Sequence, residues 1–143
     1  PTRRSSDLQR LAGLADQLQP GNPAPDGSGI IPGLDDLPAT LAQIKGDEPA
    51  ILMAHEPDIF VEVPRRISLT LSGHTHGGQL RLFGYSPLVP SRFGNRYAYG
   101  HIVEDDRHLI VSAGFGLSNL PIRLGAPPEI VVVELGGAGL PAA

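Results

Sequence analysis

Three of the five histidines in the sequence come just after apolar segments of strand length. His55 follows the run AILMA, while His74 and His76 follow the run ISLTL inside the glycine-rich element GHTHGG. Ligands in open α/β sheets gather at the carboxyl ends of strands, so we expect these imidazoles to converge on one site. If the second segment is extended, positions i and i+2 point to the same side, and His74 and His76 reach neighbouring metal positions.

The composition restricts the chemistry of such a site. The 143 residues include no cysteine, which excludes disulfides, thiolate ligands and a cysteine nucleophile, so any metal must be held by nitrogen and oxygen. The formal net charge of −4 provides no basic footprint for binding nucleic acid. There are 18 glycines and 15 prolines without a collagen-like period, which predicts short elements joined by sharp turns.

The N-terminus limits what can be said about localisation. No apolar run approaches the roughly 18 residues that span a bilayer, and no signal peptide is visible. The chain nevertheless begins at Pro1, and its opening PTRRSS fits nothing downstream, so residues 1–6 could be non-native. We expect further sequence upstream of Pro1. This stretch is compatible with a parent protein in the cytoplasm and with one associated with the membrane.

Several other charged residues have two interpretations each. Arg92, Arg96 and Arg123 lie in loops rich in glycine and proline, where they could bind phosphate oxygens bidentately or simply face solvent. Glu56 could orient the imidazole of His55 or be an ordinary surface carboxylate.

The remaining histidines and one acidic pair are expected to be structural. His101 and His108 have no neighbouring glycines or acidic partners, so we interpret them as surface or strand residues. Asp35 and Asp36 end a short extended run over residues 30–34, where a solvated turn is favoured over a role in the site.

The spacing of apolar residues and turn formers predicts a mixed α/β class, because strands alternate with helices early and dominate late. Leucines at helical spacing predict a helix over residues 7–19. Further helices are expected over residues 37–45 and 58–63. Strands are expected over residues 50–54, 67–71, 79–83 and 129–135, with a hairpin formed by residues 97–103 and 108–111.

Two strings resemble the C-terminal half of the calcineurin-like metallophosphoesterases: ILMAHEP over residues 51–57 and SGHTHGGQL over residues 72–80. The later strings PSRFG, SAG and LPIR are similar to a bacterial branch of that superfamily, often membrane-associated, which includes phosphodiesterases and UDP-2,3-diacylglucosamine hydrolase-like proteins. The resemblance implies a four-layer α/β/β/α sandwich with a two-metal centre between its sheets.

The resemblance also implies roles for individual residues. His55 and His74 would bind the second metal and His76 the first, with Mn, Fe or Zn as candidate ions. The family further requires Asp-x-His, Gly-Asp-x-x-Asp and Asn-His motifs upstream of His55, and residues 1–54 contain no histidine. Arg92 and Arg123 are the candidate substrate-binding residues.

Together these points divide the chain into three parts. Residues 1–29 would form an N-terminal helix and linker, residues 30–135 the C-terminal half of a metallophosphoesterase domain, and residues 136–143 a flexible tail. The parent protein is then expected to hydrolyse a phosphomonoester, phosphodiester or pyrophosphate bond, while this stretch alone, without the other half of the domain, would be inactive. The alternative is a non-catalytic structural or interaction domain whose histidines bind one metal or none.

Overall fold

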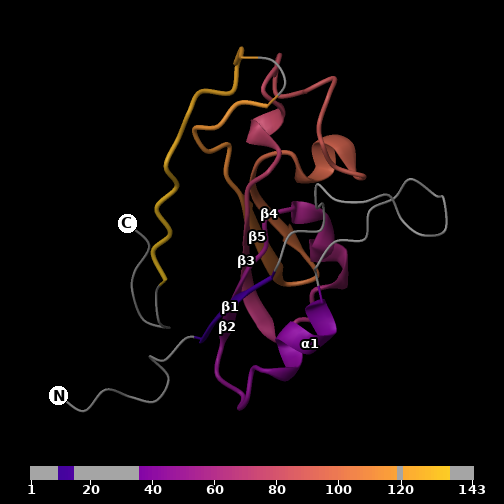
Figure 1. Cartoon of the computed structure of the whole chain (residues 1–143), viewed down its shortest axis with the longest axis vertical. Coiled ribbons are helices and arrows are strands. Elements are labelled where there is room, and N and C mark those ends of the chain that lie inside the picture. Colours follow the sequence, from indigo (N-terminus) through magenta and orange to yellow (C-terminus); the bar gives the residue numbers. More distant parts are fainter. Residues whose placement is uncertain (1–9, 15–35, 119–120, 136–143) are drawn as a thin grey trace, which may run out of the picture.

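The computed structural model describes residues 10–14, 36–118 and 121–135, which include one five-stranded sheet. The strand order is β1-β2-β3-β5-β4, and Figure 1 shows helix α1 packed beside this sheet. The strands are β1 (Arg10–Gly13), β2 (Ala50–Met53), β3 (Ile67–Ser72), β4 (Gly100–Glu104) and β5 (Arg107–Val111). All neighbours pair in parallel except β4 and β5, so the expected mixed α/β class is confirmed.

Short helical elements connect the strands. Helix α1 (Leu37–Ala42) begins at Asp36, whose side chain accepts a hydrogen bond of 2.8 Å from the backbone N–H of Ala39. This cap satisfies one of the free donors of the first turn, so Asp36 has a local structural role. The 3-10 helices are η2 (Pro57–Glu62), η3 (His76–Gly78) and η4 (Gly94–Tyr97). In the described part of the chain, no helix has the length and apolar character needed to cross a membrane.

The core lies against the central strands. Leu52, Leu109 and Val111 are fully buried, and they pack in one cluster with Phe60 of η2 and Tyr97 of η4. The Phe60 and Tyr97 rings meet edge to face with centroids 5.8 Å apart. The runs after which the histidines come do form strands, but β2 is buried on one face only. Ala50 and Leu52 are fully buried whereas Met53 is 48% exposed, so the burial on both faces that a continuous apolar run predicts is wrong here.

Three expected elements are wrong. Residues 10–13, expected within a helix over 7–19, form β1, because backbone pairing with β2 overrides the helical spacing of the leucines. Residues 79–83 form only two isolated bridges, Leu80 with Leu124 and Leu82 with Tyr85, and no continuous strand, since Gln79 and Phe83 have positive φ angles of 47° and 51°. Residues 129–135 are not a strand either, because within the described structure they have no ladder partner. Residues 15–35 and 136–143, including Asp35, lie outside the described part.

The predicted hairpin is confirmed as β4 and β5, joined by Asp105 and Asp106. Both turn residues have positive φ, 51° and 60°, which is the requirement of a two-residue type I′ turn. The first strand begins at Gly100 instead of Tyr97, because residues 94–97 form η4.

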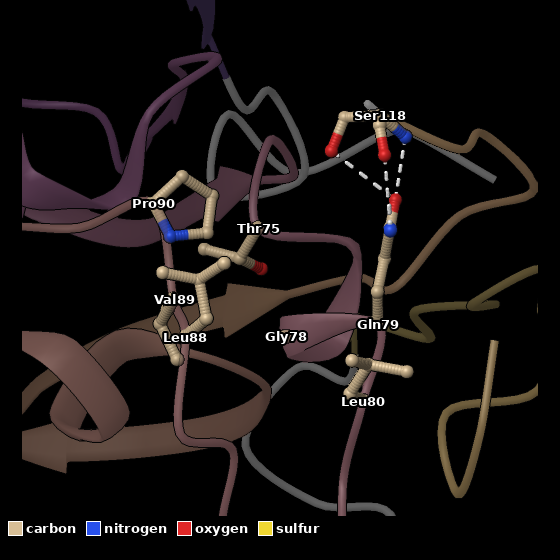
Figure 2. A pocket seen from close by; sticks show the side chains of 8 residues that line it. All are labelled: Thr75, Gly78, Gln79, Leu80, Leu88, Val89, Pro90 and Ser118. Atoms are coloured by element: carbon tan, nitrogen blue, oxygen red, sulfur yellow. Dashed lines mark hydrogen bonds between the residues drawn. The ribbon is translucent and has the colours of Figure 1, made fainter. Parts of the chain in front are cut away.

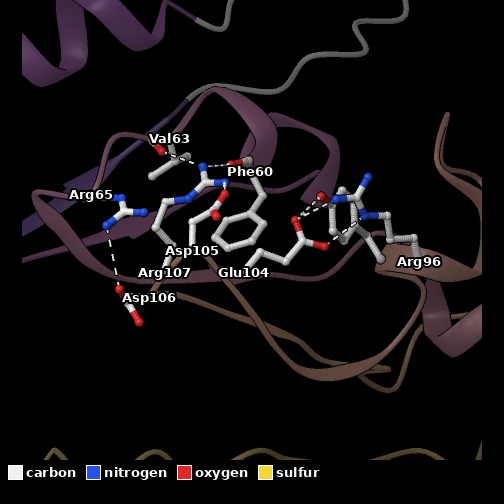
Figure 3. Close-up of polar contacts among 9 residues, drawn as sticks. Phe60, Val63, Arg65, Arg96, Glu104, Asp105, Asp106 and Arg107 are labelled. Carbon is white, nitrogen blue, oxygen red and sulfur yellow. Dashed lines mark hydrogen bonds and ion pairs between the residues drawn. The ribbon is translucent and has the colours of Figure 1, made fainter.

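Arg107 ties this hairpin to η2 (Figure 3). Its guanidinium donates hydrogen bonds of 2.9 Å to the Phe60 carbonyl and 2.7 Å to the Val63 carbonyl. The same group lies 4.9 Å from the centre of the Phe60 ring. Since η2 follows His55 and Glu56 directly, Arg107 helps to hold the segment that presents them.

A second polar cluster fixes the start of the hairpin. Arg96 donates two hydrogen bonds, 2.8 and 2.9 Å long, to the Glu104 carboxylate (Figure 3). The Tyr97 hydroxyl donates a third, of 2.8 Å, to the same carboxylate. Burial, together with the hydrogen bond to Glu104, raises the pKa of Tyr97 to about 12. The folded state therefore retains the Tyr97 proton at a pH where an exposed tyrosine, with a pKa of about 10, loses it.

This difference predicts an alkaline loss of stability. The stabilisation linked to Tyr97 should be complete below pH ~10 and should fall as the pH rises towards about 12, because the unfolded state releases the proton first. Tyr97→Phe should flatten the decline in the free energy of unfolding between pH 8 and 11, measured by urea titration. Tyr85→Phe, at an exposed tyrosine, is the control. Equal slopes for wild type and Tyr97→Phe would contradict the assignment.

Candidate metal centre

Two parallel strands bring two histidines together. The segments that leave β2 and β3 stay paired beyond the strands, with hydrogen bonds of 3.0 Å from Ala54 N–H to the Leu71 carbonyl and from Gly73 N–H to the His55 carbonyl. As a result, His55 Nε2 lies 3.1 Å from His74 Nδ1, and the ring centroids are 4.9 Å apart.

This pair has the geometry of ligands to one ion. Two nitrogens that each lie about 2.1 Å from a shared ion, at tetrahedral or octahedral angles, are separated by about 3.0–3.4 Å. Glu56 is buried next to the pair, and one ligand atom from each of His55, Glu56 and His74 lies within 4.8 Å of the others. Two imidazoles and a carboxylate suit divalent transition metals.

The His74 ring has one nitrogen that the contact with His55 leaves unused. Its Nε2 is buried and has no hydrogen-bond partner among the described residues. Metal-bound histidines normally use the other ring nitrogen in a hydrogen bond that fixes the ring, and the described residues provide no such partner for His74 Nε2. Burial also lowers the pKa of His74, assisted by His55 and His76 and opposed by Glu56. The shift favours the neutral imidazole, which is the form that binds metal.

The loop that carries His74 and His76 is bent, so the expectation of an extended segment is wrong. His74 and His76 have φ angles of 67° and 51°, and Gly77 and Gly78 continue in the left-handed region at 63° and 79°. Each non-glycine residue there costs of order 1 kcal/mol or more and persists only when its surroundings enforce it. Thr75 provides one anchor, because its buried hydroxyl donates a 2.7 Å hydrogen bond to the Ala98 carbonyl.

His76 lies outside the group formed by His55, Glu56 and His74. Its Nδ1 is 3.0 Å from Gln79 Oε1, and its Nε2 faces Gly116, where an added Cβ would lie 3.1 Å from that nitrogen. The glycine thus leaves open the space that a ligand of Nε2 would use. His55 and His74 are placed as a pair and His76 separately, and the expected division of the three between two ions stays a prediction.

Gln79 sets the orientation of the His76 ring. Figure 2 shows the Gln79 amide bonded to Ser118. Gln79 Oε1 accepts from Ser118 N–H at 2.5 Å and from Ser118 Oγ at 3.2 Å, while Gln79 Nε2 donates to the Ser118 carbonyl at 3.1 Å. Because Oε1 accepts, a neutral His76 donates from Nδ1, and its Nε2 carries the lone pair towards Gly116.

This arrangement predicts the tautomer of His76. At a pH above 8, nitrogen-15 NMR of the imidazoles should show the proton of His76 on Nδ1. Gln79→Ala should shift His76 towards the more common Nε2–H form, while the tautomer of His101 on the hairpin stays unchanged as an internal control. An Nε2–H form in the wild type would contradict the arrangement.

A second loop packs tightly against the histidine loop. The Ser86 hydroxyl lies 2.8 Å from the Gly78 carbonyl oxygen and 3.0 Å from the Leu88 carbonyl oxygen, and it shares its single proton between them. The amide of Asn95 in turn bonds both backbone groups of Ser86, at 2.8 and 2.6 Å. A Cβ on Gly78 would collide with the Ser86 side chain, so glycine is required there by space as well as by its φ of 79°.

Gly78→Ala should therefore destabilise the protein by about 3 kcal/mol or more, since it adds a steric clash to a left-handed backbone. Gly84→Ala is the matched control, because Gly84 has a similar φ of 84° but nothing within 4 Å of its Cβ direction. The control should cost only about 1 kcal/mol in the free energy of unfolding. Equal losses in the two variants would show that the contact with Ser86 is unimportant.

The arginines expected to bind phosphate have defined partners. Arg123 directs its guanidinium to backbone carbonyls of its own loop, including those of Ala113 at 2.7 Å and Gly116 at 2.6 Å. The Arg92 side chain is 66% exposed and lies 3.5 Å from the carboxylate of Asp58. Contact of Arg92 and Arg123 with a substrate stays a prediction. Of the two guanidinium groups, that of Arg92 is the more accessible.

The remaining candidates lie elsewhere. His101 and His108 contact each other on the hairpin, with ring nitrogens 2.9 Å apart, and Arg96 binds Glu104. Gln79 and Ser118 were not among the residues predicted from the sequence, although the position of Gln79 immediately after GHTHGG was the available signal.

Asp58 was also missed. It is buried and accepts hydrogen bonds from the Ser91 hydroxyl at 2.5 Å and from Arg92 N–H at 2.7 Å. It thereby joins the segment after His55 to the loop over residues 86–95.

A cavity of about 480 Å³ opens beside His55 at the carboxyl ends of the first three strands. It is lined by Gly13, Leu14, Met53, Ala54, His55, Leu71, Ser72 and Gly73. This is the end of the sheet at which ligands of open α/β folds bind.

The amino-acid sequence of the chain is similar to those of several curated proteins. The chain is 39% identical over 119 residues to an uncharacterized metallophosphoesterase of Bacillus subtilis, YkuE, covering 77% of this chain and 42% of the relative. It is 40% identical over 93 residues to the phosphodiesterase YaeI of Escherichia coli, covering 61% of this chain and 32% of that protein.

An uncharacterized metallophosphoesterase of Aquifex aeolicus is 39% identical over 93 residues, which are 62% of this chain and 33% of that protein. The chain thus spans less than half the length of the curated relatives it matches. No family model and no solved structure matches it.

Proposed function

The chain belongs to the calcineurin-like metallophosphoesterase superfamily, and we propose that the protein containing it hydrolyses phosphate esters at a two-metal centre. The observation that carries this proposal is the separation of 3.1 Å between His55 Nε2 and His74 Nδ1 at the ends of β2 and β3. Since the chain spans 42% of YkuE, we propose that ligands outside this stretch complete the centre.

Each residue then has a distinct task. His55 and His74 would hold one ion with Glu56 beside them, and His76, oriented by Gln79, would hold the other through Nε2. Bound divalent ions would polarise the phosphoryl oxygens and lower the pKa of a coordinated water. The lowered pKa of His74 keeps its ring available as a ligand in mildly acidic solution. The guanidinium of Arg92 is exposed, and within this proposal it binds the anionic substrate.

The proposal does not specify which type of phosphate bond is hydrolysed or which metal is bound. Phosphomonoesters, phosphodiesters and pyrophosphates are all candidates, and a relative named phosphodiesterase makes the diester the first substrate to test. Mn, Fe and Zn all suit imidazole together with carboxylate.

Substitution of the histidines tests the proposal in the protein that carries this chain. His74→Ala and His76→Ala should each reduce hydrolysis of bis-p-nitrophenyl phosphate with Mn by a hundredfold or more, because each removes a metal ligand. His101→Ala and His108→Ala, on the hairpin, should change turnover only a few-fold. If His108→Ala were as damaging as His76→Ala, the site would be placed wrongly.

Metal binding separates the proposal from a purely structural role. Equilibrium dialysis of the 143-residue chain against Zn should give bound metal that decreases in His55→Ala and His74→Ala. By itself the chain should hydrolyse the diester no faster than free metal does, because it provides only part of the ligand set. A chain that binds no metal yet stays folded would favour the non-catalytic alternative.

A further inference from the structure

A second, smaller cavity lies against the loop that carries His74 and His76. It has a volume of about 230 Å³, and its lining is shown in Figure 2. Residues 75–80 of the histidine loop form one wall and residues 88–90 form the other, with Ser118 at the side (Figure 2). The lining residues are Thr75, Gly78, Gln79, Leu80, Leu88, Val89, Pro90 and Ser118.

The lining restricts what this cavity can bind. None of these residues is charged, and the side chains of Leu80, Leu88, Val89 and Pro90 are apolar. The polar groups already have partners, since the Thr75 hydroxyl bonds Ala98 and the Gln79 amide bonds Ser118. A phosphate or a sugar would lose its hydration there without compensation, whereas an apolar group would not.

The walls are held together before any ligand binds. The Ser86 hydroxyl lies between the two walls and shares its single proton between the Gly78 carbonyl on one and the Leu88 carbonyl on the other. Such a preformed cavity binds without the cost of ordering its walls. A cavity of about 150 Å³ holds benzene, so this volume fits a phenyl ring or roughly five to eight aliphatic carbons.

The cavity is also adjacent to the candidate centre. Gln79 lines it and contacts His76 through Oε1, while Thr75 lies between His74 and His76 in the chain. We propose that this cavity binds the apolar part of the ester's organic group, so that the substrates are phosphate esters of apolar alcohols. This assignment deepens the proposed phosphoesterase function and rests on it for the identity of the ligand as a substrate.

Methyl NMR of the 143-residue chain tests the assignment directly. Titration with hexyl phosphate should shift the methyl signals of Leu80, Leu88 and Val89, whereas inorganic phosphate should leave them unchanged. Val89→Phe fills the cavity and should weaken hexyl phosphate binding at least tenfold. Val103→Phe, at an exposed position on β4, is the control and should change the affinity less than twofold. Leu88→Asp, at the exposed rim, gives a second variant that should also weaken binding at least tenfold.

The result is independent of the hydrolysis assays, because no metal or turnover is required. Unchanged affinity in Val89→Phe and Leu88→Asp, or shifts confined to Leu14 and Met53 of the other cavity, would overturn the assignment. Loss of binding in both variants together with absent hydrolysis would leave the apolar site in place and refute only the enzymatic proposal.

Discussion

The parallel pairing of β2 with β3 is the constraint on which the candidate centre depends. Their register continues into the connections beyond the strands, where Ala54 bonds Leu71 and Gly73 bonds His55. Two imidazoles that are 19 positions apart in the sequence are thereby fixed 3.1 Å apart. A slip of this register would move one ring relative to the other, so the hydrogen bonds of the sheet define the distance between the ligands.

The second histidine loop is held differently, by side chains rather than by a ladder. Its left-handed residues are energetically unfavourable, and the contacts of Thr75, Ser86 and Gln79 supply the opposing free energy. The loop therefore has its shape only when the segments over residues 86–98 and 116–118 are in place. The position of His76 therefore depends on the packing of these loops. The positions of His55 and His74 depend instead on the pairing of strands in the sheet.

The sequence predicted those parts of the molecule that depend on local patterns. The apolar runs of β2 and β3, the hairpin across Asp105 and Asp106, and the histidines at strand ends all follow from period, turn chemistry and position. β1 could not be predicted, because leucine spacing favours a helix and only pairing with β2 decides otherwise. The contact of Gln79 with Ser118 could not be predicted either, since it joins the Gln79 side chain to the backbone of a residue 39 positions away.

The segment after Glu129 has a practical consequence. Glu129 itself is well anchored, accepting hydrogen bonds of 2.9 Å from Ala113 N–H and 2.7 Å from the Tyr99 hydroxyl. Directly beyond it, Ile130 and Val132 are 76% and 81% exposed in a run of four β-branched residues. Such uncharged runs add readily to the free edges of sheets in other molecules, and β1 and β4 are the edges of this sheet. Self-association of this chain should therefore increase with protein concentration.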